Sequence, residues 1–281
     1  MAVGLVLEGG AHRAIYTAGV LDFLYENKVH FDGIIGVSAG AIHGCSFVSG
    51  QVGRSISYTL KYAKDKRYMS FYSLFTTGNL VGEKFCYHDL PEKLFPFNHQ
   101  AFETSPVKFY VTCTNVETGK AEYILCENLR DKMPYLRASA SMPLVSQISE
   151  IDGKKYLDGG IADSIPVRAF QKLGYERCVV VCTRAAGYRK KPNKLAPLAR
   201  LIYYKFPKFA AAVRNRHLMY NQELRDIEKM QENGEVFVIR PSKLIKISHM
   251  EKNTAVLREV YELGRHDAET ALPKLREFMK Q

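Results

Sequence analysis

The feature that most constrains the fold is a short apolar run, Phe31–Ile35, followed by the pentapeptide Gly36-Val37-Ser38-Ala39-Gly40. A helix-like stretch of small residues continues from Ala39 to Val48. A serine at a sharp turn between a strand and a helix is held in a strained conformation that lifts its hydroxyl clear of the sheet. Gly36 and Gly40 remove side chains that would collide in so tight a turn. The pattern therefore predicts a nucleophile at Ser38, although a chance match occurs in about one chain of this length in ten.

A second glycine-rich stretch, Glu8-Gly9-Gly10-Ala11-His12-Arg13, separates a strand-like run at residues 2–7 from a helix-like run at residues 14–27. Strand, loop, helix, strand, turn and helix in this order favour a parallel sheet covered by helices. The loop lacks the G-x-G-x-x-G pattern of a dinucleotide site, because Ala11 and Ala14 replace its later glycines.

The alternative interpretation is an oxyanion loop, in which backbone amides face the carbonyl oxygen of a substrate. The expected oxyanion hole includes Gly9, Gly10 and Ala11, and the N–H of Ala39 at a helix N-terminus would be a further donor. Arg13 would then hold the loop or bind an anionic headgroup. The two glycine-rich stretches together favour acyl transfer.

The rest of the chain predicts a cap, two hairpins and several further elements. Residues 51–106 are rich in aromatic side chains and are expected to form the cap. Alternating apolar residues around turn sequences predict the hairpins, the second of them around Asp152-Gly153. The predicted strands and helices are 107–114 with 121–126, 133–142, 145–151 with 154–157, 166–173, 178–183, 235–239 and 251–280.

Composition limits the compartment and the cofactors. The 281 residues are 46% hydrophobic, which is enough for a packed core. No run reaches 18 apolar residues and no basic stretch opens the chain, so we expect neither a transmembrane helix nor a signal peptide, and a cytoplasmic location. The six cysteines form no C-x-x-C pair, which favours buried thiols over disulfides or zinc. We expect no metal site and no cofactor.

The net charge of +11 is concentrated in one segment. Residues 177–222 hold eleven Lys or Arg and no Asp or Glu, and tyrosines and phenylalanines lie among them. Such a segment suits a solvated helix face or peripheral contact with an anionic membrane, where each basic residue adds roughly 1 kcal/mol. Nucleic acid is the less favoured partner, because no recognised binding module accompanies the charges. The best candidates for lipid contact are Lys190, Lys191, Lys194, Lys205 and Lys208.

Three motifs occur in a fixed order: the loop at residues 9–13, the pentapeptide at residues 36–40, and Asp158-Gly159-Gly160. Together they resemble the patatin-like phospholipases over roughly residues 3–185. The resemblance includes residues 136–143 and Ser164-Ile165-Pro166. It departs at Ala11 and Ala14, where that family has glycine. Residues after about 185 are similar to the C-terminal extension of a bacterial subgroup.

The resemblance implies a three-layer α/β/α sandwich with a mainly parallel central sheet. It implies a catalytic domain over residues 1–185 and a basic, mostly helical extension over residues 186–281, packed on the same core. Ser38 would attack the ester carbonyl, Asp158 would be the general base, and Gly159 and Gly160 would let the backbone turn beside them. The expected activity is hydrolysis of carboxyl esters in phospholipids or lysophospholipids.

Two other functions remain open on the sequence. A Ser-His-acid esterase of small esters would need a base such as His217, His249 or His266, none of which has the small neighbours of a strand-end loop. His12 lies in the oxyanion loop and His43 one turn beyond the pentapeptide. A non-catalytic basic adaptor that binds membrane or nucleic acid is the alternative from another class. The oligomeric state is not indicated.

Overall fold

The computed structural model describes residues 2–280 of the chain. These residues form one eight-stranded sheet, in which β3, β2, β1, β7 and β8 are parallel neighbours in that order and the other three strands pair antiparallel. The strands are β1 (Val3–Leu7), β2 (Gly33–Val37), β3 (Lys108–Asn115), β4 (Ala121–Leu125), β5 (Ser149–Ile151), β6 (Lys154–Asp158), β7 (Arg177–Val181) and β8 (Val236–Ile239).

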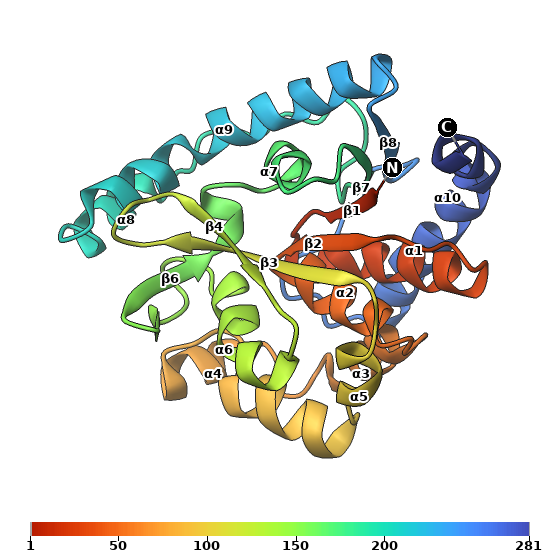
Figure 1. The fold of residues 1–281 in the computed structure, drawn as a ribbon. Coiled ribbons are helices and arrows are strands. Elements are labelled where there is room, and N and C mark those ends of the chain that lie inside the picture. Colours follow the sequence, from red (N-terminus) through yellow and green to blue (C-terminus); the bar gives the residue numbers. More distant parts are fainter. Residues whose placement is uncertain (1, 281) are drawn as a thin grey trace.

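Helices cover both faces of this sheet (Figure 1). On one face, α1 (Ile15–Glu26), α2 (Ala39–Val48), α6 (Leu129–Ser139) and α10 (Thr254–Lys280) share a core with Leu5 and Leu7 of β1. On the other face, α7 (Val167–Lys172) and α9 (Pro207–Glu232) pack against Val6 and Val180. Successive strand residues point to opposite faces, so the wholly apolar β1 contributes to both cores. The predicted three-layer α/β/α fold is confirmed.

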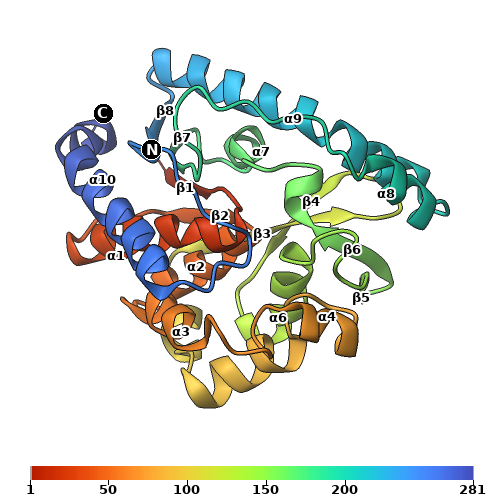
Figure 2. The same cartoon turned by 180° about the vertical axis from the view of Figure 1, so that it is seen from behind.

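The remaining helices lie at the periphery of the sandwich. The cap region contains α3 (Arg54–Tyr62), α4 (Phe71–Thr77), the π-type helix η2 (Phe85–Leu94) and α5 (His99–Glu103), and Figure 2 shows it below the sheet. Two short 3₁₀ turns, η1 (Ala11–Ala14) and η3 (Gly159–Ile161), carry predicted site residues, and α8 (Ala196–Ile202) precedes α9. The predicted boundaries of α6 were wrong: it begins at Leu129, because the Asn128 side chain accepts hydrogen bonds from the amides of Arg130 and Asp131.

The sheet forks at β3, and this fork brings two distant strands together. Thr112 of β3 pairs with Val37 of β2 and with β4 on its other side. The next residue, Cys113, pairs with Asp158 of β6 and again with β4. Because β4 occupies one edge of β3, β2 and β6 must share the opposite edge. The two strands approach each other head to head, so Ser38 and Asp158 meet where β2 and β6 end.

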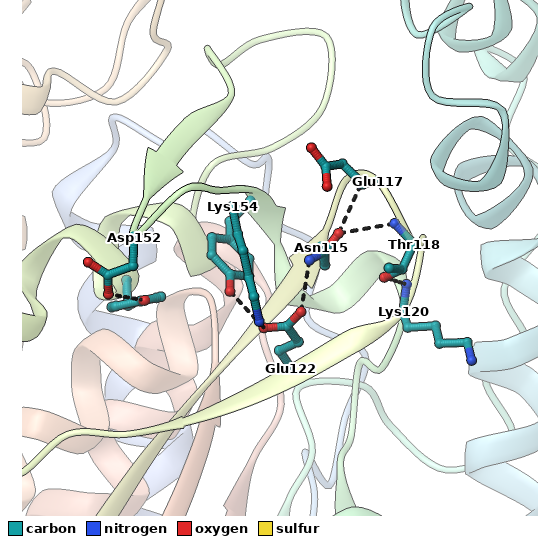
Figure 3. A network of polar contacts seen from close by, with 9 residues as sticks. Asn115, Glu117, Thr118, Lys120, Glu122, Asp152 and Lys154 are labelled. Atoms are coloured by element: carbon teal, nitrogen blue, oxygen red, sulfur yellow. Dashed lines mark hydrogen bonds and ion pairs between the residues drawn. The ribbon is translucent and has the colours of Figure 1, made fainter.

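A polar cluster ties β6 to this edge (Figure 3). The Glu122 carboxylate on β4 accepts hydrogen bonds from the Tyr156 hydroxyl at 2.6 Å and from Asn115 Nδ2 at 2.8 Å. The Lys154 ammonium lies 3.1 Å from the same carboxylate. Glu122 therefore connects β4 to β3 and β6, and it supports the pairing that places Asp158.

Helices α1 and α10 cross closely through two copies of one pattern, Tyr-x-x-Gly-x-x-Asp, at residues 16–22 and 261–267. The Tyr16 hydroxyl donates to Asp267 Oδ2 at 3.1 Å, and the Tyr261 hydroxyl donates to Asp22 Oδ2 at 2.8 Å. A Cβ on the glycine of either copy would overlap the carbonyl oxygen of the other copy's tyrosine. The contact therefore depends on glycine for close approach.

Two further observations concern the whole described chain. Within residues 2–280, no helix is both long and apolar enough to cross a membrane. All six cysteines are free, and the predicted burial of the thiols holds for all but Cys86.

Candidate active site

Ser38 stands at the sharp turn between β2 and α2. Its backbone is strained, with φ 53° and ψ −126°, because the chain reverses from strand to helix within one residue. A Cβ on Gly36 would lie 2.5 Å from Ala41 Cα, and one on Gly40 would lie 2.7 Å from the carbonyl oxygens of Leu7 and Glu8. Both glycines are therefore needed for close approach, as the sequence predicted.

Ser139 supports this turn from α6. Its hydroxyl accepts a hydrogen bond from the Ser38 amide at 2.8 Å and donates to the Thr112 carbonyl at 2.7 Å. The hydroxyl thus joins the nucleophile turn to the fork in β3. Ser139 lies within the 136–143 stretch that carries the resemblance, but no local pattern marks it for this role. Its partners Ser38 and Thr112 are distant in sequence and reach it only through the packing of α6 against the sheet.

Asp158 ends β6 and is buried, with 6% of its surface exposed. Its Oδ1 accepts a hydrogen bond from the Gly160 amide at 2.8 Å, and the Ser38 side chain favours the charged form of the same carboxylate. Burial raises the pKa of Asp158, and the nearby charge of Arg216 opposes that rise. A partly desolvated carboxylate in contact with a serine hydroxyl can take its proton.

Gly159 is required for steric reasons, and Gly160 leaves room for the side chains around it. A Cβ on Gly159 would overlap the Thr112 carbonyl oxygen, and one on Gly160 would lie 3.0 Å from Arg216 Nη2. Arg216 comes from α9 and donates a hydrogen bond to the Gly160 carbonyl. No local signal in the sequence connects Arg216 to Asp158, because the two are far apart along the chain.

The loop after β1 lies against the nucleophile turn. A Cβ on Gly9 would come within 3.1 Å of Ser38 Cβ, and Gly10 has an extended φ of 174°. Ala11 adopts a left-handed φ of 47°, a conformation that glycine adopts more easily. The loop is braced through Thr183, whose hydroxyl accepts from Arg13 Nε at 3.2 Å and donates to the Gly9 carbonyl at 3.2 Å.

Glu8, a buried carboxylate that sequence analysis left without a role, anchors the same loop. Its two oxygens accept hydrogen bonds from the Thr183 amide and the Tyr220 hydroxyl, both at 2.6 Å. Tyr220 lies on α9, so the loop is tied to the C-terminal part of the chain. The two bonds satisfy the hydrogen-bonding capacity of the buried Glu8 carboxylate, and Arg13 lies within electrostatic range of it.

Two cavities meet at Ser38. One, of about 110 Å³, is mostly apolar and is lined by the cap, α2 and α6. The other, of about 630 Å³, is a cleft lined by polar and cationic side chains from the loop after β1, the chain after β7, and α9. Ala11, Ser38 and Met142 line both. An ester that bridges the two would place its carbonyl group beside Ser38.

The histidines occupy several environments around the site. His12 and His43 line the apolar cavity, and burial lowers their pKa values to about 4 and about 3, so both are neutral at pH 7. His217 and His249 line the cleft, and His266 lies within α10. In the part of the chain that the structure describes, no hydrogen bond joins a histidine to Ser38 or Asp158. The same residues contain no group of three or more His, Cys, Asp or Glu side chains placed to hold a metal ion.

Comparison with known proteins places this site in a family. A model of the family described as patatin-like phospholipase matches residues 5–170. A second model, of a domain of unknown function, DUF6363, matches residues 206–280. The uncharacterized protein YjjU of Escherichia coli K12 is 26% identical over 268 residues, which cover 94% of this chain and 75% of that protein.

Fungal lysophospholipases match a smaller part of the chain. Lysophospholipase nte1 of Emericella nidulans is 29% identical over 189 residues, and the match covers 62% of this chain and only 11% of that protein. The crystal structure of VipD from Legionella pneumophila aligns with a TM-score of 0.48 and 12% identity, over 97% of this chain and 67% of that one. The match of the family model over more than half of the sequence shows that this chain belongs to the patatin-like phospholipase family.

Proposed function

We propose that this chain is a serine acyl hydrolase that cleaves carboxyl esters of phospholipids or lysophospholipids. Its membership of a phospholipase family and its lysophospholipase relatives support a lipid acyl hydrolase. The single observation that carries the proposal is the placement of Asp158 beside Ser38, which lines both cavities. The apolar cavity suits an acyl chain, and the cleft suits the polar part of the lipid.

In the proposed reaction, Ser38 Oγ attacks the ester carbonyl carbon and its proton passes to the Asp158 carboxylate. The resulting oxyanion accepts hydrogen bonds from backbone amides of the Gly9–Ala11 loop and of Ala39. The protonated Asp158 then gives its proton to the leaving alcohol oxygen, which leaves an acyl group on Ser38. Asp158 next takes a proton from water, and the hydroxide attacks the acyl carbonyl carbon. The bond between that carbon and Ser38 Oγ then breaks, which releases the fatty acid, and Asp158 returns its proton to Ser38 Oγ. The cycle uses no metal ion and no cofactor.

Substitution of either member of the dyad tests the mechanism. Ser38→Ala and Asp158→Asn are each expected to lower kcat on the order of 10³-fold or more, and the double variant should be little worse, because the two groups act as a unit. A fluorophosphonate probe should label the wild type stoichiometrically and should not label Ser38→Ala. Ser57→Ala, a change at an exposed serine on α3, is the matched control and should label fully. Absence of labelling in the wild type would favour a non-catalytic adaptor.

We also propose peripheral contact with an anionic membrane through residues 177–222. Helix α8 and its flanks expose Leu195, Leu198, Leu201, Ile202 and Tyr204, each by 44% or more of its surface. Exposed Lys194, Arg200, Lys205 and Lys208 lie among them. Apolar side chains next to cations are typical of an interfacial helix. Lys190 and Lys191 line the cleft, so they are poorer candidates for this contact than the sequence indicated.

A further inference from the structure

The cleft beside Ser38 carries an excess of positive charge. Its lining includes two carboxylates, Glu8 and Asp158, and six cations, Arg13, Arg184, Arg189, Lys190, Lys191 and Arg216. The Glu8 carboxylate accepts hydrogen bonds from Thr183 and Tyr220, and Arg189 forms an ion pair with Glu228 at 2.9 Å. Within residues 2–280, neither Arg184 nor Lys190 forms an ion pair with a carboxylate.

These two cations are held in place by the chain around them. The Lys190 amide donates to Asn221 Oδ1 at 2.7 Å, and Asn221 Nδ2 donates to the Lys190 carbonyl at 3.0 Å, which fixes the loop on α9. The Lys190 ammonium lies 4.9 Å from the centre of the Tyr220 ring. The Arg184 guanidinium lies 4.3 Å from the centre of the Tyr188 ring. Cations over aromatic rings are partly desolvated and lose little freedom when an anion binds.

We infer that Arg184 and Lys190 form a subsite for a phosphate group in the non-acyl half of the substrate, with Arg13 and Arg216 on the same cleft. The inference rests on the proposed ester hydrolysis, because it places the acyl chain in the apolar cavity and the headgroup in the cleft. Arg184, Lys190 and Arg216 all lie beyond residues 5–170, so the match to the family model does not include them. The preferred substrate is therefore an ester lipid with an accessible phosphate.

Electrostatics supports this assignment. Burial, together with the charges of Arg216, Arg13 and Arg184, lowers the pKa of Lys190 to about 8, against the opposing charge of Glu8. Like charges that lie together in a half-buried cleft repel one another. A bound anion attracts each of them and so offsets the repulsion. A phosphate offers acceptor oxygens that match the planar fork of an arginine and the point charge of a lysine.

An ether-linked ligand pair tests the subsite without turnover, because the enzyme cannot hydrolyse an ether. Calorimetry at pH 7 measures the affinity of the full chain for 1-O-octylglycerol 3-phosphate and for 1-O-octylglycerol. Both ligands are used below their micelle concentrations. We expect the phosphate ligand to bind at least about tenfold more tightly. Arg184→Gln and Lys190→Gln should each weaken its binding about tenfold or more and should reduce the preference for the phosphate ligand. The control is Arg214→Gln, an exposed arginine on α9, which should bind both ligands as the wild type does.

The outcomes separate the subsite from the proposed function. Equal affinity of the wild type for the two ligands would overturn the subsite, and so would unchanged phosphate binding in both variants. Inorganic phosphate that binds as tightly as the ether lipid would show a free-phosphate site instead of a headgroup site. If the preference is present but no ester is hydrolysed in a Ser38-dependent manner, the proposed function falls and the anion subsite stands. The comparison of the two ligands on the wild type tests the subsite even if one variant fails to fold.

Discussion

Two opposing influences set the ionisation of Asp158. Burial favours its neutral form, and the Arg216 charge, the Gly160 amide and the Ser38 hydroxyl favour its carboxylate. The net effect is a raised pKa, so the proposed general base should lose its activity at a higher pH than an ordinary aspartate would. The largest influence that opposes burial comes from Arg216 on α9, which does not belong to the predicted motifs.

The pH dependence of turnover follows from this balance. As pH falls, kcat/KM should decline while Asp158 takes up its proton, and the midpoint should lie above the usual aspartate pKa of about 3.9. Arg216→Gln removes the nearest opposing charge and should move the midpoint to higher pH. A pH profile with a short neutral ester measures this, and Arg214→Gln is the control. An unchanged midpoint in Arg216→Gln would contradict the electrostatic assignment.

A second carboxyl group, Glu223, contacts Asp163 close to the same turn. The Tyr123 hydroxyl donates to Asp163 Oδ2 at 2.6 Å, and the Ser164 amide donates to Glu223 Oε1 at 3.0 Å. Burial and the charge of Asp163 raise the pKa of Glu223 well above its ordinary value. The buried Oε2 of Glu223 has no other partner within the described chain, which fits a proton held between the two groups.

This raised pKa makes stability depend on pH. A group whose pKa is higher in the folded state contributes full stability below its unfolded pKa, and loses that contribution as pH rises through the folded pKa. Urea unfolding at pH 5 to 8 should show the wild type losing up to about 1.4 kcal/mol per pH unit from this one proton. Glu223→Gln, which stays neutral, should flatten that slope, whereas Glu232→Gln on the exposed face of α9 should not. A slope unaltered by Glu223→Gln would mean that the pair is not protonated.

At the scale of elements, the crossing of α1 and α10 joins the first helix of the chain to the last. The crossing depends on glycine in both helices, because each glycine lies against a backbone carbonyl of the partner. The two Tyr–Asp hydrogen bonds then satisfy polar groups that are buried at the contact. The C-terminal helix is therefore part of the core that supports the sheet.

Gly264→Ala should separate these helices. The added methyl group would meet the Tyr16 carbonyl, so we expect a net loss of about 1–3 kcal/mol in the free energy of unfolding, despite the better helix propensity of alanine. Urea denaturation measures the loss. Glu262→Ala, at an exposed position of the same helix, should change stability by less than about 0.5 kcal/mol. Stability gained in Gly264→Ala would show that the helices can move apart without cost.

At the scale of the whole molecule, cations are divided between two places. Arg184, Lys190 and Arg216 line the cleft, while Lys194, Lys205 and Lys208 are exposed around α8 with apolar side chains between them. The first group can contact a ligand near Ser38. The second group can contact a surface, and its attraction to anionic lipid should weaken as salt rises, because screening limits exposed charges to about 8 Å at physiological ionic strength.

Reversal of the exposed charges tests the proposed membrane contact. A triple variant changes Lys194, Lys205 and Lys208 to Glu. It should bind vesicles of anionic lipid at least tenfold more weakly, because each lost cation removes roughly 1 kcal/mol and each new anion repels the surface. Vesicle sedimentation at low and moderate salt measures binding. A triple change at Lys28, Lys64 and Lys172, which are exposed elsewhere, is the control. Equal loss in both triple variants would show that net charge, and not this surface, governs binding.

The sequence by itself determined the local parts of this protein. The glycines around Ser38 and the run from Gly9 to Arg13 predicted their turns, because a tight turn excludes side chains whatever lies elsewhere in the chain. Uninterrupted apolar runs predicted β1 and β7, and Asp152-Gly153 predicted a hairpin. The residues at the candidate site, Ser38 and Asp158, were named from motifs, but the motifs did not state that the two would touch.

Only the tertiary structure decided that contact and the character of the cleft. Ser38 and Asp158 meet because β2 and β6 share one edge of β3, and strand pairing across that distance depends on register and packing that no local pattern specifies. Ser139, Glu8 and Arg216 acquire their partners by the same long-range packing. The number of charges in residues 177–222 is evident from the sequence. The path of the chain after β7 decides which of these charges line the cleft beside Ser38 and which are exposed to solvent.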